Sequence, residues 1–98
     1  SGLWSNIKRS IQRKRMPVVL GVMGVYLSNR REQAPDVQEV LTKYGDMIRS
    51  RTGVHDPATS KGLITLSLEA DHGEIQALEA ELEDVSGVEV STALFRGR

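Results

Sequence analysis

The sequence contains no cysteine, few aromatic residues and no long apolar run. Without cysteine, disulfides, thiolate zinc sites and cysteine nucleophiles are excluded, and a reducing cytoplasmic location is the expectation. The longest apolar run, residues 18–27, is much shorter than the roughly 18 to 20 residues that a membrane-spanning helix needs. The chain has 98 residues, the size of one domain, and a core this small is often supplemented by oligomerisation.

The charge of the chain is balanced overall but unevenly distributed. Residues 1–17 contain five of the 13 basic residues and none of the 13 acidic ones, so they carry +5 and the remainder carries −5. A nucleic-acid surface on the mildly acidic remainder is therefore not expected.

Residues 1–17 are predicted to form a separate basic leader, and residues 18–96 the folded domain. If this segment formed a helix, one of its faces would be apolar and would contain Leu3, Trp4, Ile7 and Ile11. Met16 directly precedes the first predicted strand and is a candidate native start, so the preceding residues are either an added leader or an upstream extension.

The run "VVLGVMGVYL" predicts a central strand that is apolar on both faces, with glycine at positions 21 and 24. One face would lie under helices, and the other would remain uncovered in a single subunit. An exposed apolar patch of this kind usually marks an interface, and glycine permits close approach there. The pattern does not show which glycine faces outward. The residues predicted for an oligomer interface are Val18, Leu20, Gly21, Val22, Gly24 and Tyr26.

The remaining pattern alternates between helical and strand periodicity. A helix is expected from about Pro35 to Ile48, with Pro35 and Asp36 suited to its first turn. Asp71 and Glu74 form the signature of a capping box, and Gly87 suits the end of the helix that follows. Strands are expected near residues 50–55, 63–70 and 88–95. The order predicts an α+β, ferredoxin-like βαββαβ fold, a four-stranded antiparallel sheet with two helices on one face.

Several segments together resemble the iron-only hydrogenase system regulator family. They are "VLGVMGVYLSNR", "VQEVLTKYGDMIRSRTGV" and "KGLITLSLEADHGEIQALEAELEDVSGVEVSTALF", which cover residues 18–95. The resemblance implies an ACT-like ferredoxin fold and assembly through the sheets. It also implies a ligand site where the first strand meets the first helix, at a subunit interface. That position holds Ser28, Asn29, Arg30 and Arg31, whose donors suit a small anion such as a carboxylate or phosphate; an ordinary polar loop is the alternative.

No other chemistry is indicated by the sequence. His55 and His72 are the only histidines, and two isolated imidazoles fall short of the three or four convergent ligands of a transition-metal site. No nucleophile, base and cleft coincide, so no enzymatic activity, metal or cofactor is expected.

The protein is therefore expected to be a non-enzymatic regulatory or sensor domain that acts as a transcriptional regulator. It would form a homo-oligomer, either a dimer or a tetramer, and bind a small ligand or a protein partner at a subunit interface. The alternative is an accessory protein that contacts nucleic acid or a membrane through basic residues 1–15.

Overall fold

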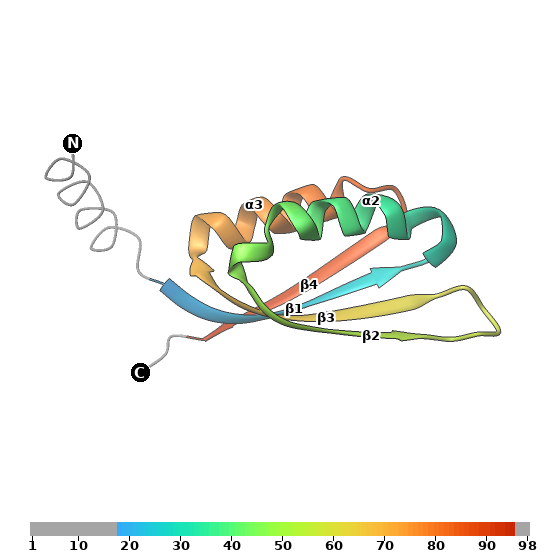
Figure 1. Ribbon diagram of the computed structural model, residues 1–98, viewed down its shortest axis with the longest axis horizontal. Coiled ribbons are helices and arrows are strands. Elements are labelled where there is room, and N and C mark those ends of the chain that lie inside the picture. Colours follow the sequence, from blue (N-terminus) through green and yellow to red (C-terminus); the bar gives the residue numbers. More distant parts are fainter. Residues whose placement is uncertain (1–17, 96–98) are drawn as a thin grey trace, which may run out of the picture.

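A computed structural model describes residues 18–95 of the chain, and the predicted leader lies outside these residues. The elements follow the predicted order of strands and helices (Figure 1). They are β1 (Val18–Leu27), α2 (Arg30–Lys43), a short 3₁₀ turn η1 (Gly45–Met47), β2 (Ile48–His55), β3 (Gly62–Asp71), α3 (His72–Glu83) and β4 (Val88–Phe95).

The four strands form one antiparallel sheet in the order β2-β3-β1-β4. Both helices cover the same face of this sheet, and the opposite face carries no helix of the described chain (Figure 1). The predicted ferredoxin-like α+β fold is thus confirmed. The strand β1 lies between β3 and β4, and its pairing with β3 extends from Val18 opposite Asp71 to Leu27 opposite Gly62. This central position gives β1 a hydrogen-bonded neighbour at each edge.

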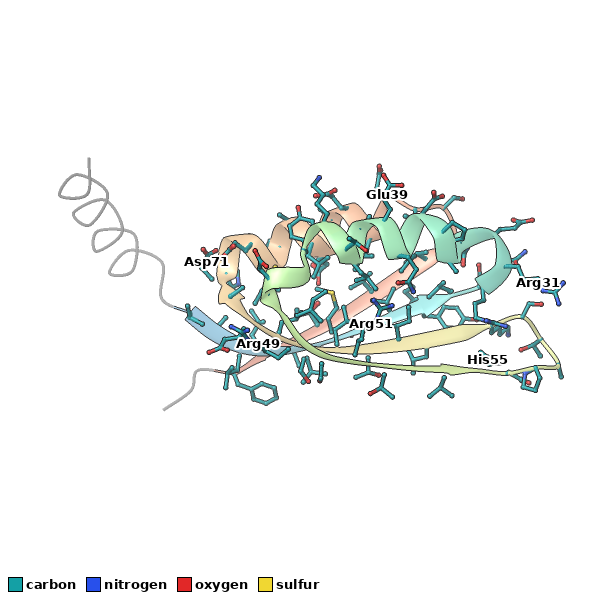
Figure 2. All side chains as sticks on the ribbon, in the orientation of Figure 1. Arg31, Glu39, Arg49, Arg51, His55 and Asp71 are labelled. Atoms are coloured by element: carbon teal, nitrogen blue, oxygen red, sulfur yellow. The ribbon has the colours of Figure 1, made fainter. Side chains whose placement is uncertain are left out.

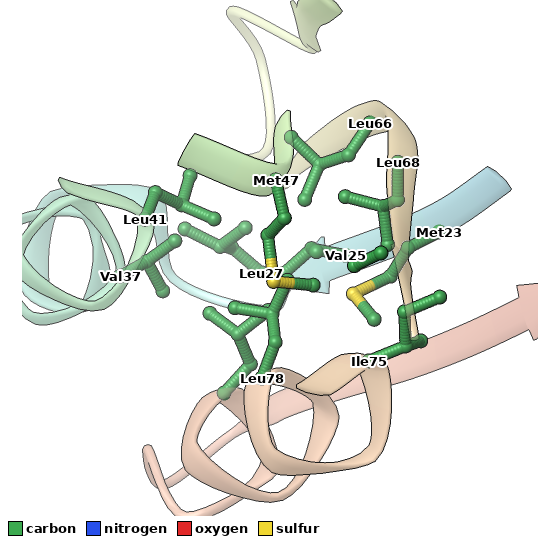
Figure 3. Close-up of a cluster of buried hydrophobic side chains, with 12 residues drawn as sticks. Met23, Val25, Leu27, Val37, Leu41, Met47, Leu66, Leu68, Ile75 and Leu78 are labelled. Atoms are coloured by element: carbon green, nitrogen blue, oxygen red, sulfur yellow. The ribbon is translucent and has the colours of Figure 1, made fainter. Parts of the chain in front are cut away.

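The core lies between the sheet and the two helices (Figure 3). Because side chains alternate along a strand, every second residue of β1 and β3 points into this layer. Each helix contributes one apolar stripe with helical spacing, as predicted. The buried apolar residues are Met23, Val25, Leu27, Val37, Leu41, Met47, Leu66, Leu68, Ala70, Ile75, Leu78 and Leu82.

The first helix differs from the prediction at both ends. It begins at Arg30, five residues before Pro35, because Asn29 takes an extended N-cap conformation and its carbonyl accepts a hydrogen bond from the Gln33 amide at 3.0 Å. Pro35 therefore lies inside the helix rather than at its start. The helix ends at Lys43, and the chain turns through η1 so that Ile48 already belongs to β2.

The ends of α3 follow the sequence closely. The amide of Glu74 donates to Asp71 Oδ1 at 2.8 Å, and Glu74 Oε1 accepts from the Asp71 amide at 3.3 Å, which confirms the predicted capping box. The hydrogen bond to the Asp71 side chain raises the pKa of Glu74 above its usual value. After the helix, Gly87 adopts a φ of 83°, the left-handed conformation that glycine takes at little cost.

Candidate functional site

The face of the sheet opposite the helices is an uncovered surface with many exposed apolar side chains. Every second residue of β1 from Val18 to Tyr26 points toward it, and the residues between them point into the core. Several of its large apolar side chains are well exposed, from 40% for Val22 to 64% for Val54. We call this surface the open face; its apolar side chains are Val18, Leu20, Val22 and Tyr26 of β1, Val54 of β2, Leu63 of β3, and Ala93 and Phe95 of β4.

Strand register orders the open face into rows that cross the sheet. The two central rows contain small or hydroxyl-bearing residues apart from Val22, and the rows at either end contain larger apolar ones. One central row is Thr52, Thr65, Gly24 and Ser91, and the row next to it is Ser50, Ser67, Val22 and Ala93. The end rows contain Val54, Leu63 and Tyr26 on one side, and Leu20 and Phe95 on the other.

Charged groups on the open face lie near its ends. Glu69 is opposite Leu20, and its Oε1 accepts a hydrogen bond from Arg49 Nε at 2.8 Å. Glu89 lies opposite Tyr26, and Asp71 is the N-cap of α3. The Arg49–Glu69 pair is about half exposed, so it contributes little stability by itself. The central rows carry no charge, and a partner would meet no unpaired ion there.

The structure separates Gly21 from the other residues predicted for the interface. Gly21 is buried on the helix side of β1, and a Cβ added to it would lie 3.9 Å from Cδ1 of Ile75 in α3. Gly24 faces the opposite way, with Leu63 Cδ1 at 4.0 Å from an added Cβ. The placement of Gly21 on the interface was wrong, because strand alternation sets residues 21 and 24 on different faces.

Two of the four predicted ligand residues take part in an internal hydrogen-bond network. The buried side chain of Gln33 accepts from the Asn29 amide at 2.9 Å and donates to Ser28 Oγ at 3.0 Å. It also donates to the Ser86 carbonyl at 2.8 Å, and the Ser28 amide donates to the Gly87 carbonyl at 3.3 Å. We call Ser28, Asn29, Gln33, Ser86 and Gly87 the glutamine junction; it joins the start of α2 to the turn before β4.

The other two predicted ligand residues belong to the first turn of α2 and point in different directions. Arg31 projects away from the sheet at the end of the molecule (Figure 2). Arg30 lies over Gly62, with its Cδ 3.2 Å from the position of an added Cβ, and its amide donates to the Ser60 carbonyl at 2.7 Å. The four residues therefore do not converge on one site.

Arg30 instead lines a pocket of about 240 Å³ between α2 and the edge of the sheet. Arg51 and His55 of β2 line the same pocket, and Arg51 extends toward α2 (Figure 2). Sequence reasoning missed these two residues. The available signal was the alternation of Arg51, Gly53 and His55, which places all three on one face of β2.

A second polar cluster ties the two helices together. Glu81 of α3 accepts hydrogen bonds from Lys43 Nζ, at 2.9 Å, and from the Tyr44 hydroxyl. The Tyr44 hydrogen bond and then the Lys43 hydrogen bond lower the pKa of Glu81, whereas the Glu81 carboxylate raises the pKa of both donors. The cluster is paired within itself and is best understood as a helix-to-helix contact.

Among residues 18–95, no group of three or more histidine, aspartate and glutamate side chains is arranged to hold a metal ion. None of the helices described is both long enough and apolar enough to cross a membrane.

Comparison with known proteins places the chain in a family. No curated protein matches it significantly. TM1266 of Thermotoga maritima, an uncharacterized protein of known structure, superposes with a TM-score of 0.76 at 25% identity over 81% of this chain and 99% of that one. A dimeric ferredoxin-like protein from an uncultured marine organism gives a TM-score of 0.41 at 13% identity, covering 81% and 94%. The model of the TM1266-like family, described as "Iron-only hydrogenase system regulator, putative", matches residues 19–92, and the chain therefore belongs to this family.

Proposed function

We propose that the chain is a non-enzymatic regulatory domain that works as a homo-oligomer, with two copies joined through the open face. The family description supports the regulatory role. The observation that carries self-association is the open face itself, which is apolar, free of charge at its centre and uncovered by any described element.

The energetic argument concerns the exposed aliphatic and aromatic side chains of this face. Burying one such side chain fully is worth about 1.5 to 3 kcal/mol, so several of them provide a substantial driving force for association. Val18, Leu20, Val54 and Phe95 are each more than half exposed in the single subunit. In a single subunit the apolar groups at both ends of the open face remain in water, and large exposed apolar patches usually mark an interaction surface.

A second copy fits this surface better than an unrelated partner because the pattern suits two-fold pairing. Larger apolar residues at both ends flank small residues in the middle, around Gly24 and Ser91. Two such faces related by a two-fold axis bring their small centres together, where backbones approach closely, and each contact occurs twice.

The test is sedimentation velocity on the full chain and on Gly24→Arg. We expect the unmodified protein to sediment as a dimer or larger at micromolar concentration, and Gly24→Arg to shift it to a folded monomer. The substitution is compatible with the subunit fold, because an added Cβ meets nothing closer than 3.9 Å. Gln76→Arg, at an exposed position of α3, is the matched control and should not alter the assembly.

Two outcomes would contradict the proposal. One is a folded monomer for the unmodified protein at all micromolar concentrations. The other is a monomer that associates only after residues 1–15 are deleted, because the apolar residues of the leader would then cover the open face of their own subunit. Circular dichroism of each variant verifies that the subunit is folded.

A further inference from the structure

The pocket between α2 and β2 lies on the helix side of the sheet, opposite the open face. One wall is formed by Arg30, Ala34 and Gln38, which are spaced four residues apart and so share one side of the helix. The facing wall is the helix side of β2, with Gly53 between Arg51 and His55. Val54 and Leu63, which belong to the open face, also line the pocket, so one end of it reaches the edge of the surface proposed to join the subunits.

The pocket exists because small residues face each other across it. Gly53 is the clearest case, since a Cβ added there would find no atom within 4 Å. Its φ lies outside the left-handed region, so the backbone conformation does not require glycine. Ala34 provides the corresponding space on the helix. Since neither a turn nor a close contact requires glycine at position 53, we attribute it to the space that it leaves open for a ligand.

The ionisable groups that line the pocket are all basic side chains, and Gln38 adds a neutral amide. Arg30 and Arg51 bring two guanidinium groups and His55 an imidazole, and none of the described lining residues is acidic. Guanidinium groups bind carboxylate and phosphate oxygens in a paired, planar geometry.

Both arginines are held in place before any ligand arrives. Arg51 Nη2 donates to Gln38 Oε1 at 2.6 Å, which fixes the guanidinium against α2. The methylene groups of Arg30 pack over Gly62, and its amide is bonded to the carbonyl of Ser60. Ser60 has a φ of 63°, an uncommon value for a residue other than glycine. Ordering these side chains in advance reduces the entropy that binding must offset.

The remaining lining is apolar. Leu27 is buried and Ala34 and Ile64 are partly buried around the same space. Inorganic phosphate would leave this apolar lining without a contact. An amino acid would bring an ammonium group next to two arginines, with no acidic lining residue to bind it.

We propose that the pocket binds a small monocarboxylate with a short branched aliphatic body. The carboxylate is held by Arg30 and Arg51, and the aliphatic part lies against Leu27 and Ile64. The volume of about 240 Å³ limits the ligand to a few carbon atoms beyond the carboxylate. The site shares Val54 and Leu63 with the open face, whereas Arg51 and Gly53 lie on the helix side of β2.

The test is isothermal titration of the full chain with 4-methylpentanoate, alongside leucine, which adds an ammonium group to the same skeleton, and inorganic phosphate. We expect 4-methylpentanoate to bind at least about tenfold more tightly than either. No binding of 4-methylpentanoate at millimolar concentration would overturn the proposal. Equal binding of leucine or of phosphate would overturn the assignment of the ligand class.

Two variants test the location by independent means. Arg51→Gln removes a charged donor and should weaken binding about tenfold or more, since a hydrogen bond to a charged group is worth about 1.5 kcal/mol or more. Gly53→Val fills the pocket and should abolish binding. Arg31→Gln, outside the pocket, and Gln76→Arg, on the exposed side of α3, are the controls and should bind as the unmodified protein does. Undiminished binding by both Arg51→Gln and Gly53→Val would overturn the location.

Sedimentation of the same samples reports the assembly separately, so that failure of one proposal is not mistaken for failure of the other.

Discussion

The backbone of Gly87 lies directly against the side-chain amide of Gln33, although the two residues belong to different elements. A Cβ built on Gly87 would overlap Gln33 Nε2 and come within 2.7 Å of Ser28 Oγ. The same glutamine bonds the Ser86 carbonyl and the Asn29 amide. The glutamine junction thus depends on one residue with no side chain and on one buried amide.

Gly87→Ala should destabilise the protein. The left-handed conformation alone costs a residue with a Cβ about 1 to 2 kcal/mol, and the overlap with Gln33 adds to this cost. Urea unfolding at one fixed protein concentration measures the change. Gly45→Ala is the control, because an added Cβ there meets nothing within 4 Å. Equal stability of the two variants would show that the turn before β4 rearranges freely.

Gln33→Ala should lower the free energy of unfolding by about 1 to 3 kcal/mol, because the Ser86 carbonyl and Asn29 amide lose their partner in a partly buried site. Gln38→Ala, an exposed glutamine of the same helix, should change stability by less than about 0.5 kcal/mol. The comparison uses the same unfolding measurement. A loss as large for Gln38 as for Gln33 would contradict the structural role assigned to the junction.

The fold was predictable because strand and helix periodicities are local properties of the sequence. The alternation of Ile64, Leu66 and Leu68 and the capping box at Asp71 and Glu74 each depend on residues a few positions apart, and both were predicted correctly. The outward direction of Gly24 was not predictable, because the run from Val18 to Leu27 is apolar on both faces.

Some differences from the prediction depend on contacts between elements distant in sequence. Gln33, in the first half of α2, bonds the nearby Asn29 amide and, across the fold, the Ser86 carbonyl. The same glutamine donates to Ser28, which was predicted to bind a ligand. The pocket requires α2 and β2 to face each other, and no local pattern reports that Ala34 will lie across from Gly53.

The cluster around Glu81 predicts a specific dependence of stability on pH. Hydrogen bonds from Tyr44 and Lys43 lower the pKa of Glu81 below its usual value of 4.5. A carboxylate whose pKa is lowered by folding stabilises the protein above its unfolded pKa, and this contribution disappears as the pH falls through the lowered value. Glu81→Gln should therefore reduce stability at pH 7, and its difference from the unmodified protein should shrink below pH 4.5.

The measurement is thermal unfolding between neutral pH and the acid range, with Glu83→Gln as the control. Glu83 is an exposed carboxylate of the same helix. A difference between Glu81→Gln and the unmodified protein that stays constant through the acid range would argue against the paired state of Glu81.

The two glycines of β1 should respond in opposite ways to the same substitution. Gly21→Ala places a Cβ 2.8 Å from Leu94 Cδ2 and 3.3 Å from the Ala93 carbonyl oxygen, so Leu94 or the backbone of β4 must move. Overpacking of this kind costs about 1 to 3 kcal/mol. Within the subunit, Gly24→Ala meets only ordinary contacts at 3.9 and 4.0 Å and gains about 0.5 to 1 kcal/mol from the lower flexibility of alanine in the unfolded chain, whereas it opposes the close approach of a second copy. Urea unfolding of both variants at several protein concentrations separates the two effects, because only the loss at the interface depends on concentration. A concentration-independent loss that is greater for Gly24→Ala than for Gly21→Ala would show that β1 presents its faces the other way round.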